Sequence, residues 1–588
     1  MLQQSYRARS RDHAHRTGEV IMNKYAIFHK PESNYAYATA WNKLTIVLRV
    51  AANDKLDKVE ILYNNKYSFT KTRSVISMAR YVEDGIFAYY RAEITLSDAR
   101  FAYIFKITEK GKVLYYSEEG LTEEYKFNLA YYTFFQFAFI NSVDIMPVVE
   151  WTRNAVFYQI FIDRFARGDF DKDDKYINTP WDSEINRYSF TGGDLDGITG
   201  KLPYLKDMGI NALYLTPIFL SESNHKYSIK DYLTVDPQFG DGEKLKKLLS
   251  SAHDSGMKVI IDTVFNHCDC KHEFFKDVVE RGRESKYYDW FLIDGDYPDT
   301  KLGNYACFAE CKHMPKWNTS NSDVRRYLTD IALEYLKTGF DGLRLDVADE
   351  ISHEMWRQLR REVKATYPQA LIIGEIWHDN EHWLKGDQFD GVMNYKLQKI
   401  LVDYFGEVPL SAKDVADRMN RALIANTEQA NANSLNFLDN HDTPRFLRTA
   451  GGNEDKLLCA LCAMVMFPGM PCVFYGTEIP LDGDGDPDCR KPFDWTFKDR
   501  KAGFKENFYS ILGLKKFTAL QGIGCHICAK YGVLSITREA EKENVTAYFN
   551  TSGKAKKIEV NGDVIFSLNY KNNRLLNDGT VVVKNIKN

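Results

Sequence analysis

The chain has 588 residues, of which 44% are hydrophobic. A single hydrophobic core stops growing at roughly 250 to 300 residues, so several domains are expected. The 77 lysines and arginines nearly balance the 81 aspartates and glutamates, which gives a formal net charge of -4. Such a charge provides no basic field for nucleic acid or for an anionic membrane surface, and it favours a small, neutral partner.

No stretch of the sequence approaches the roughly 20 consecutive apolar residues that a membrane-spanning helix needs. Residues 1–21 are rich in arginine and histidine and lack the apolar core of a signal peptide. We therefore expect a cytoplasmic protein without a membrane partner. Residues 1–21 are expected to be a disordered tail or a remnant of cloning.

The ten cysteines predict reduced thiols, because the chain is large and lacks a signal-peptide pattern. The alternative is a zinc site, at Cys268, Cys270, Cys307 and Cys311 or at Cys525 and Cys528. Neither cluster has the paired spacing of a structural zinc site. We therefore expect no metal at either cluster.

Short strand patterns predict a separate domain at each end of the chain. Between residues 22 and 145, runs such as LTIVLRVA and KVEILY alternate with turns, and a hairpin is expected at Gly111. From 505 to 588 the chain completes a helix and returns to strand patterns such as YGVLSITRE. These patterns predict an N-terminal β-sandwich over 22–145 and a C-terminal β-sandwich over 505–588.

Buried apolar strands alternate with helical segments over residues 146–504, which is typical of a parallel sheet. Eight strand candidates begin at Ala155, Ala212, Lys258, Phe340, Ala370, Phe389, Ser434 and Pro471. Eight such units predict a (β/α)8 barrel, so the whole chain is a multi-domain α/β protein. Residues 268–322 are too many for an ordinary loop and predict a subdomain inserted into the barrel.

Charged and polar side chains stand at the predicted ends of several strands. Asp346, Glu375 and Asp442 each follow an apolar strand, and the carboxyl ends of barrel strands meet at one rim. An ordinary salt bridge would explain one such aspartate. Three carboxylates placed close together repel one another and would destabilise the fold. A function is the better explanation of their placement, so we interpret them as catalytic.

A pair of carboxyl groups is what a retaining glycosidase needs. One ionised carboxylate attacks the anomeric carbon, and one protonated carboxyl roughly 5 to 5.5 Å away protonates the leaving oxygen. Arg344 lies two residues before Asp346, on the same face of its strand, and is expected to keep that carboxylate ionised. Crowding by other carboxylates is expected to raise the pKa of Glu375, which would then be the acid.

Four motifs follow one another on the predicted strands: DTVFNH (262–267), GLRLDVADE (342–350), GEIW (374–377) and FLDNHD (437–442). In this order they resemble the α-amylase family of glycoside hydrolases, over essentially all of residues 22–588. The resemblance implies that Asp346 is the nucleophile, that Glu375 is the acid/base and that Asp442 binds sugar hydroxyls. It implies substrate contacts for His225, Tyr227, His267, Arg344, Trp377, His441, Asp486 and Arg490.

The motif MPKWN at 314–318 is similar to the MPKLN of one branch, that of neopullulanase, cyclomaltodextrinase and maltogenic amylase, with Trp317 in place of leucine. An N-terminal β-domain, similar to starch-binding domains, is a further mark of this branch. Members of the branch commonly dimerise, so a homodimer is expected by analogy.

Two departures from the family pattern bear on specificity and on metal binding. Asp349 replaces the asparagine of the usual VANE, which leaves the linkage preference open. Many relatives bind calcium in a loop like NGDxxND together with a later GGD. Here Arg167 and Lys172 stand where oxygen ligands would be expected, and a cation cannot ligate calcium. The remaining candidate ligands are Asp169, Asp173, Gly192 and Asp194, and we expect no required cofactor and no calcium.

The resemblance implies a hydrolase of α-1,4-linked glucans that retains the anomeric configuration, acting on maltooligosaccharides, cyclodextrins, pullulan or starch. Cleavage of α-1,6 bonds and transfer to sugar acceptors stay open. One alternative is an oligosaccharide α-1,6-glucosidase or an enzyme that mainly transfers glucosyl units. The other is a non-catalytic glycan-binding protein, which would require a broken carboxylate set.

Overall fold

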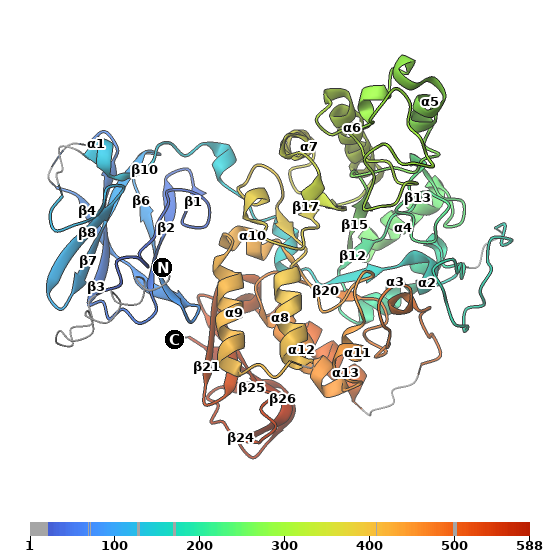
Figure 1. Cartoon of the computed structure of the whole chain (residues 1–588). Coiled ribbons are helices and arrows are strands. Elements are labelled where there is room, and N and C mark those ends of the chain that lie inside the picture. The colour runs from blue at the N-terminus through green and yellow to red at the C-terminus, as the bar shows by residue number, and fades with distance from the viewer. Residues whose placement is uncertain are drawn as a thin grey trace, which may run out of the picture. The chain divides into compact units, whose positions relative to one another are not determined.

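The structure is a computed structural model, and it describes residues 22–68, 70, 72–125, 130–168, 172–406, 408–497 and 503–587. The tail predicted for residues 1–21 lies outside the described residues. The chain divides into two compact units, Met1–Asn141 and Ser142–Asn588 (Figure 1). Within the part of the chain that is described, no helix has the length and apolar character needed to cross a membrane.

The first unit is built from two antiparallel sheets, which confirms the predicted β-sandwich. One sheet has the order β1 (Ala36–Ala40), β2 (Lys43–Ala51), β6 (Phe87–Thr95), β5 (Ala79–Glu83). The other has the order β4 (Ser74–Ser77), β3 (Lys58–Asn65), β7 (Phe101–Glu109), β8 (Lys112–Ser117), β9 (Gly120–Thr122), with β10 (Phe135–Phe137) beside β7. The β7–β8 hairpin turns at Lys110 and Gly111, which both have a positive φ, as the predicted turn requires.

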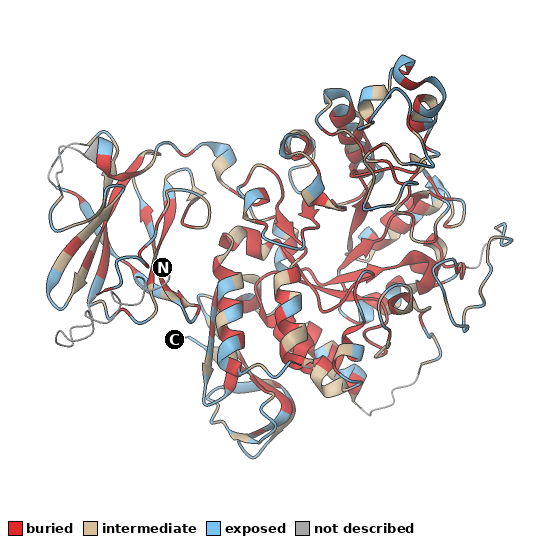
Figure 2. Cartoon of the chain, viewed as in Figure 1, coloured by how far each residue is buried: buried red, intermediate tan, exposed pale blue. Residues whose placement is uncertain are grey.

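Eight parallel strands form the centre of the second unit and confirm the predicted barrel. They are β11 (Phe157–Ile160), β12 (Ala212–Leu215), β15 (Lys258–Thr263), β16 (Gly342–Leu345), β17 (Leu371–Gly374), β18 (Gly391–Val392), β19 (Leu435–Asn436) and β20 (Met470–Phe474). Their order is β18-β17-β16-β15-β12-β11-β20-β19, and a parallel bridge between Met393 and Leu435 joins the two ends. Apart from Lys258 at the start of β15, the residues of these strands are buried (Figure 2), as a packed barrel core requires.

The longer helices of this unit are α3 (Leu195–Asp207), α4 (Gly242–Asp254), α6 (Ser322–Thr338), α7 (His353–Thr366), α8 (Tyr395–Phe405), α9 (Ala412–Ile424), α12 (Glu454–Met466) and α13 (Phe504–Leu512). The shorter ones are α2 (Ile162–Phe165), α5 (Glu273–Arg281), α10 (Glu428–Ala432), α11 (Phe446–Thr449) and α14 (Thr518–Gln521), and α1 (Ala130–Thr133) belongs to the first unit. Side-chain caps fix several helix starts. The Ser352 hydroxyl, for example, accepts a hydrogen bond from the Met355 backbone at the start of α7.

The inserted segment 268–322 contains α5 and a set of short antiparallel bridges, beside the hairpin of β13 (Phe219–Leu220) and β14 (Asp231–Val235). Trp317 is 1% exposed, stacks on Phe291 with 4.9 Å between ring centroids, and donates its indole N–H to the Tyr232 hydroxyl. The tryptophan that replaces the customary leucine is therefore part of the core of this subdomain.

The chain ends in one six-stranded antiparallel sheet of β21 (Gly524–Lys530), β22 (Val533–Glu539), β23 (Glu543–Asn550), β26 (Arg574–Ile586), β24 (Lys556–Lys557) and β25 (Asp563–Lys571). This is the predicted C-terminal β-domain, and it packs on α9 and α12 of the barrel (Figure 1). All ten cysteines are free, and no three His, Cys, Asp or Glu side chains of the described residues are arranged to hold a metal.

Candidate active site

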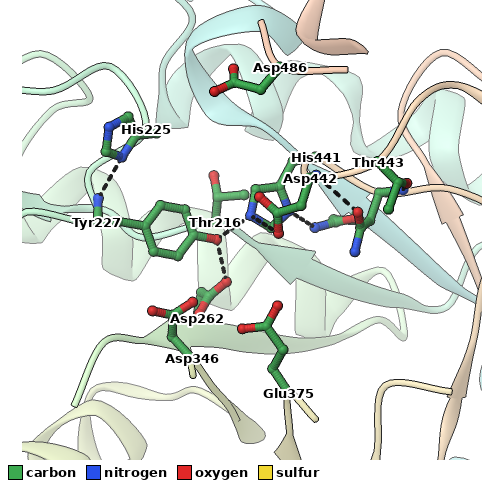
Figure 3. Close-up of polar contacts among 12 residues, drawn as sticks. Thr216, His225, Tyr227, Asp262, Asp346, Glu375, His441, Asp442, Thr443 and Asp486 are labelled. Atoms are coloured by element: carbon green, nitrogen blue, oxygen red, sulfur yellow. Dashed lines mark hydrogen bonds and ion pairs between the residues drawn. The ribbon is translucent and has the colours of Figure 1, made fainter. Parts of the chain in front are cut away.

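The predicted site residues meet at the carboxyl ends of the barrel strands. Arg344 lies on β16, Asp346 follows it, Glu375 follows β17, and the segment after β19 carries His441 and Asp442. Figure 3 shows the carboxyl groups of Asp346, Glu375 and Asp442 pointing toward a common space. Asp346 and Glu375 are each 6% exposed.

Arg344 connects the acidic groups at the bottom of the site. Its Nη1 lies 2.8 Å from Asp346 Oδ1 and 2.8 Å from Asp262 Oδ1, and its Nη2 lies 2.8 Å from Glu375 Oε1. Arg344 and Asp262 are 0% exposed, and all three acidic partners, which come from three adjacent strands, are buried. One cation therefore pairs with three carboxylates, and it donates hydrogen bonds to Asp262 and Asp346 through Nη1.

The Glu375 carboxyl group is oriented by three further donors. Oε1 accepts from the Trp377 indole at 3.1 Å and from the Tyr395 hydroxyl at 3.2 Å, and Oε2 accepts from the Val347 backbone at 3.0 Å. Val347 reaches this position with a left-handed backbone, φ 44°, which is costly for a β-branched residue. The strained backbone of Val347 thus allows a hydrogen bond between the segment that follows β16 and Glu375, which follows β17.

Asp442 lies on the other side of the common space and its side chain is 32% exposed. Its carboxylate is 3.3 Å from Arg490 Nη2 and 3.2 Å from His441 Nε2. Arg490 also pairs with Asp486 at 3.0 Å, and its Nε donates to the His441 carbonyl at 2.7 Å. The predicted residues Asp442, Asp486 and Arg490 are therefore brought together.

Tyr227 connects the three predicted histidines. Its hydroxyl lies 2.5 Å from His441 Nε2, and the two rings are parallel, with centroids 5.4 Å apart. Its backbone N–H donates to His225 Nδ1 at 3.1 Å, and its carbonyl accepts from His267 Nε2 at 3.1 Å. Figure 3 shows His225 and His441 on opposite sides of the Tyr227 ring.

Burial keeps these histidines neutral. It lowers the pKa of His225 to about 3 and that of His267 to about 3. It also lowers the pKa of His441 far below its ordinary value, and Arg490 and Arg344 lower it further. At neutral pH each imidazole thus carries one proton and can both donate and accept one hydrogen bond.

Burial and the neighbouring arginines have opposite effects on the pKa values of Asp346 and Asp442. Burial raises the pKa of Asp346 well above its ordinary value; Arg344 lowers it, but Glu375 raises it again. Burial also raises the pKa of Asp442 against the effect of Arg490. Arg344 thus favours the ionised form of Asp346, as the sequence predicts, and burial opposes this effect.

Four residues in contact with this site were not among the predicted site residues: Gln159, Tyr214, Asp262 and Tyr395. Tyr214 and Asp262 lie on neighbouring strands and are joined by a 2.7 Å hydrogen bond. Tyr395 begins α8 directly after the sixth strand, where Trp377 stacks on it at 3.9 Å. Asp262 was recognised at a strand end, in the motif DTVFNH, but without a role; Tyr395 lies three residues beyond β18 and gave a similar signal, whereas Gln159 lies within a strand.

The segment in which many relatives bind calcium contains a lysine ammonium. Lys172 Nζ lies 2.7 Å from Asp194 Oδ2, 2.8 Å from the Gly192 carbonyl and 3.3 Å from the Gln238 carbonyl, and its side chain is 4% exposed. Asp173 is exposed, Arg167 pairs loosely with Asp174 at 3.6 Å, and Asp169 lies outside the described residues. These groups do not fit a calcium ion, because an ammonium already binds the buried oxygens.

Family comparisons agree with this geometry. Residues 159–517 match the model described as alpha amylase, catalytic domain, and residues 22–141 match the alpha amylase N-terminal ig-like domain. The chain is 39% identical to a cyclomaltodextrinase of Thermoanaerobacter pseudethanolicus, over 92% of this chain and 94% of that protein. It is 38% identical to neopullulanase 2 of Thermoactinomyces vulgaris, over 91% of this chain and 92% of that protein.

Among solved structures, one titled cyclomaltodextrinase superposes with a TM-score of 0.87 at 33% identity, over 96% of this chain and 98% of that one. The two family models together cover the N-terminal domain and the barrel. The chain therefore belongs to the α-amylase family of glycoside hydrolases, in the branch of cyclomaltodextrinase, neopullulanase and maltogenic amylase.

Proposed function

We propose that this protein hydrolyses α-1,4-glucosidic bonds in cyclodextrins, pullulan, maltooligosaccharides or starch, with retention of the anomeric configuration. The observation that carries the proposal is the binding of Asp346 and Glu375 to two nitrogens of one buried guanidinium. Two carboxyl groups held at adjacent strand ends can act on the two sides of a single glycosidic bond.

In this mechanism Asp346 is the nucleophile and Glu375 the general acid. Asp346 attacks the anomeric carbon and forms a glucosyl ester, while Glu375 gives its proton to the leaving oxygen. Glu375 then takes a proton from water, which attacks the ester and releases the sugar. The reaction begins with Asp346 ionised and with a proton on Glu375, and both carboxyl groups contact Arg344.

The remaining polar groups are assigned to substrate binding. We assign sugar contacts to His225, Tyr227, His267, Arg344, Trp377, His441, Asp442, Asp486 and Arg490. Asp442 can accept hydrogen bonds from sugar hydroxyls, since its carboxylate is held by Arg490 and is still partly exposed. Trp377 is 52% exposed beside Glu375, so its ring can stack on an incoming sugar.

A second candidate function follows from Asp349. Its carboxylate pairs with His378 Nε2 at 2.9 Å, and the two residues stand three positions after Asp346 and Glu375. This contact joins the two catalytic segments where the branch usually has an asparagine. An enzyme that prefers α-1,6 bonds, or that mainly transfers glucosyl units, is the alternative that this difference favours.

We also propose a homodimer, a cytoplasmic location and independence from calcium. The homodimer rests on analogy with the branch, and large apolar side chains such as Trp41, 59% exposed, are available on the first unit. The ten free thiols suit a reducing compartment. The Lys172 ammonium supports independence from calcium.

Sedimentation velocity at micromolar concentration tests the dimer.

The test of the catalytic proposal compares the wild type with Asp346→Asn and with Asp379→Asn, a control whose carboxylate is exposed on the segment after β17. We expect the wild type and the control to open β-cyclodextrin, and Asp346→Asn to lose at least about 10³-fold in kcat. NMR of the first product should detect the α-anomer. Full activity of Asp346→Asn, or a β-anomer formed first, would refute the mechanism.

Hydrolysis of pullulan separates the two candidate functions. Pullulan contains both α-1,4 and α-1,6 bonds, so the products reveal which bond is cut. Cleavage mainly at α-1,4 bonds is expected, and cleavage only at α-1,6 bonds would favour the second candidate. A dominance of transfer products at high sugar concentration would favour a transferase.

A further inference from the structure

Gln159 lies on β11 inside the barrel, 1% exposed, and belongs to none of the groups assigned to catalysis or substrate binding. Its backbone carbonyl accepts from the Tyr475 N–H at 2.9 Å, which fixes it between β11 and the segment after β20. Its side-chain Nε2 lies 2.8 Å from His441 Nδ1. A buried amide thus contacts the ring nitrogen of His441 that points away from the substrate site.

The direction of the hydrogen bonds can be followed from Asp262. This carboxylate accepts from Arg344 at 2.8 Å and from the Tyr214 and Tyr227 hydroxyls at 2.7 Å each. An ionised carboxylate can only accept, so Tyr227 must give its single proton to Asp262. The Tyr227 oxygen must then accept a hydrogen bond from its other neighbour, His441 Nε2.

The same conclusion comes from Asp442. Its Oδ2 lies 3.2 Å from His441 Nε2 and is an acceptor as well. Two acceptors therefore face one nitrogen, and that nitrogen must carry a hydrogen. Because burial keeps His441 neutral, Nδ1 has no hydrogen and must accept. Only the amide N–H of Gln159 is placed to donate to it among the described residues.

We propose that Gln159 is a positioning residue that holds His441 in the Nε2–H tautomer, so that His441 presents a hydrogen-bond donor to an oxygen of the bound sugar. This inference rests on the proposed hydrolysis of α-glucans and extends it beyond the groups that touch substrate. In the opposite tautomer a lone pair of Nε2 would face the Asp442 carboxylate and the Tyr227 oxygen, which is repulsive.

The substitution Gln159→Glu tests this polarity, because it replaces the amide N–H with an acceptor of the same size. At low pH the introduced carboxyl group and His441 Nδ1 share one proton. Whether that proton lies on the carboxyl group or on Nδ1, Nε2 still carries its own hydrogen. When that proton is lost, the carboxylate draws the remaining hydrogen to Nδ1, and the donor at Nε2 disappears. The variant therefore depends on pH in a way that the wild type does not.

Other titratable and charged groups also face His441, and they are unchanged in the variant: Asp442, Tyr227, His225, Arg344, Glu375 and Arg490. Their titrations appear in both proteins and cancel in the ratio of variant to wild type. The ratio of kcat/KM values at each pH therefore reports the proton shared between His441 and the introduced carboxyl group.

We expect kcat/KM of Gln159→Glu on β-cyclodextrin to lie within about tenfold of the wild type at pH 5 and to fall at least about tenfold further by pH 8. Gln159→Met removes the donor without adding a charge, so a loss of about fivefold to tenfold is expected at every pH. The matched control is Gln388→Glu. Gln388 is 0% exposed, and its side chain contacts His353 Nδ1 at 2.8 Å outside the site. Its pH profile should follow the wild type.

A constant ratio for Gln159→Glu between pH 5 and pH 8 would overturn the proposal. Circular dichroism and the melting temperature establish that each variant is folded. If Gln159→Glu does not fold, ¹⁵N NMR of histidine-labelled wild type decides, with the His441 signals assigned by their loss in His441→Gln. At pH 7 we expect a hydrogen on Nε2 and none on Nδ1. A neutral ring with its hydrogen on Nδ1 would refute the proposal. This measurement holds even if the wild type proves inactive on glucans, which would refute only the proposed function.

Discussion

Lys172 illustrates how one residue can alter what a loop binds. Its ammonium contacts the Asp194 carboxylate and the carbonyls of Gly192 and Gln238, and all of these contacts are shielded from solvent. Asp194 also accepts from the backbone of Gly168 and caps α3 through Gly197. A positive charge is therefore needed there to balance a buried carboxylate that starts a barrel helix.

Substituting Lys172 by methionine should destabilise the barrel by about 3 to 5 kcal/mol, because the Asp194 carboxylate would stay buried without a cation. A fall in the melting temperature of Lys172→Met, measured by scanning calorimetry, is the expected result. Lys175→Met, at an exposed position of the same segment, should melt like the wild type.

The same experiment tests independence from calcium. The melting temperature of the wild type should be equal in millimolar calcium and in a chelator. A rise in calcium would contradict the proposal that the ammonium takes the place of the ion.

At the residue scale, sequence predicted the groups that stand at strand ends and missed those that reach the site from elsewhere. Asp346, Glu375 and Asp442 were found because a charge after an apolar strand is unusual. Gln159 was missed because a glutamine inside a strand gives no signal of the imidazole it faces. The effect of Arg344 on the pKa of Asp346 was predictable from their spacing, but the opposing effect of burial was not, since burial cannot be read from neighbours in sequence.

At the scale of single elements, α7 and the neighbouring strands depend on a buried carboxylate. Asp390, directly before β18, is 0% exposed and accepts from Arg360 at 2.9 Å and from Lys364 at 2.7 Å. The two basic residues lie four apart on α7 and so share one face. Asp390 also accepts from the Ile372 backbone on β17, the strand that leads to Glu375.

Replacing Asp390 by asparagine should therefore lower the melting temperature by several degrees, because two basic side chains would lose their counter-charge in the interior. The control is Asp387→Asn. Asp387 pairs with Arg357 of the same helix, but both side chains are well exposed, so a change of no more than about 1 kcal/mol is expected. Equal destabilisation by the two substitutions would show that burial of the triad has no special role.

Elements of the barrel were predictable because eight apolar segments recur with helices between them. Their lengths were not predictable, since β18 and β19 contain only two residues each and continue as loops that carry site residues. Periodicity marks where a strand is buried, but hydrogen-bond geometry decides where it ends. The order of the strands was enough to place the carboxylates on one rim, and the exact limits of the strands were not needed.

At the scale of the whole molecule, sequence predicted which domains are present but not how the C-terminal sheet is attached to the barrel. Lys515 follows α13 and is 4% exposed; its ammonium donates to the carbonyls of Gly469 and Leu520 at 2.8 and 3.0 Å. Arg538 on β22 binds the carbonyls of Met466, Gly522 and Gly524. Lysine and arginine are normally surface residues, so their sequence positions gave no sign of this junction.

The junction should make stability depend on pH in the alkaline range. Burial, with a contribution from Arg538, lowers the pKa of Lys515 from its ordinary 10.5 to about 7. Between these two values the unfolded chain binds a proton that the folded chain does not, so stability rises with pH across this window. The slope is about 1.4 kcal/mol per pH unit for this one group, and it vanishes below about pH 7, where both states are protonated.

Lys515→Met removes this titration, so the melting temperature of the wild type relative to the variant should increase by several degrees from pH 7 to pH 9.5. Lys516→Met, one residue further on at an exposed position, should give a constant difference from the wild type over the same range. The comparison between variants cancels the tyrosines and other lysines that titrate above pH 9. If the Lys515→Met difference were also constant, the ammonium would not be buried in the folded protein, and the C-terminal sheet would be attached by other contacts.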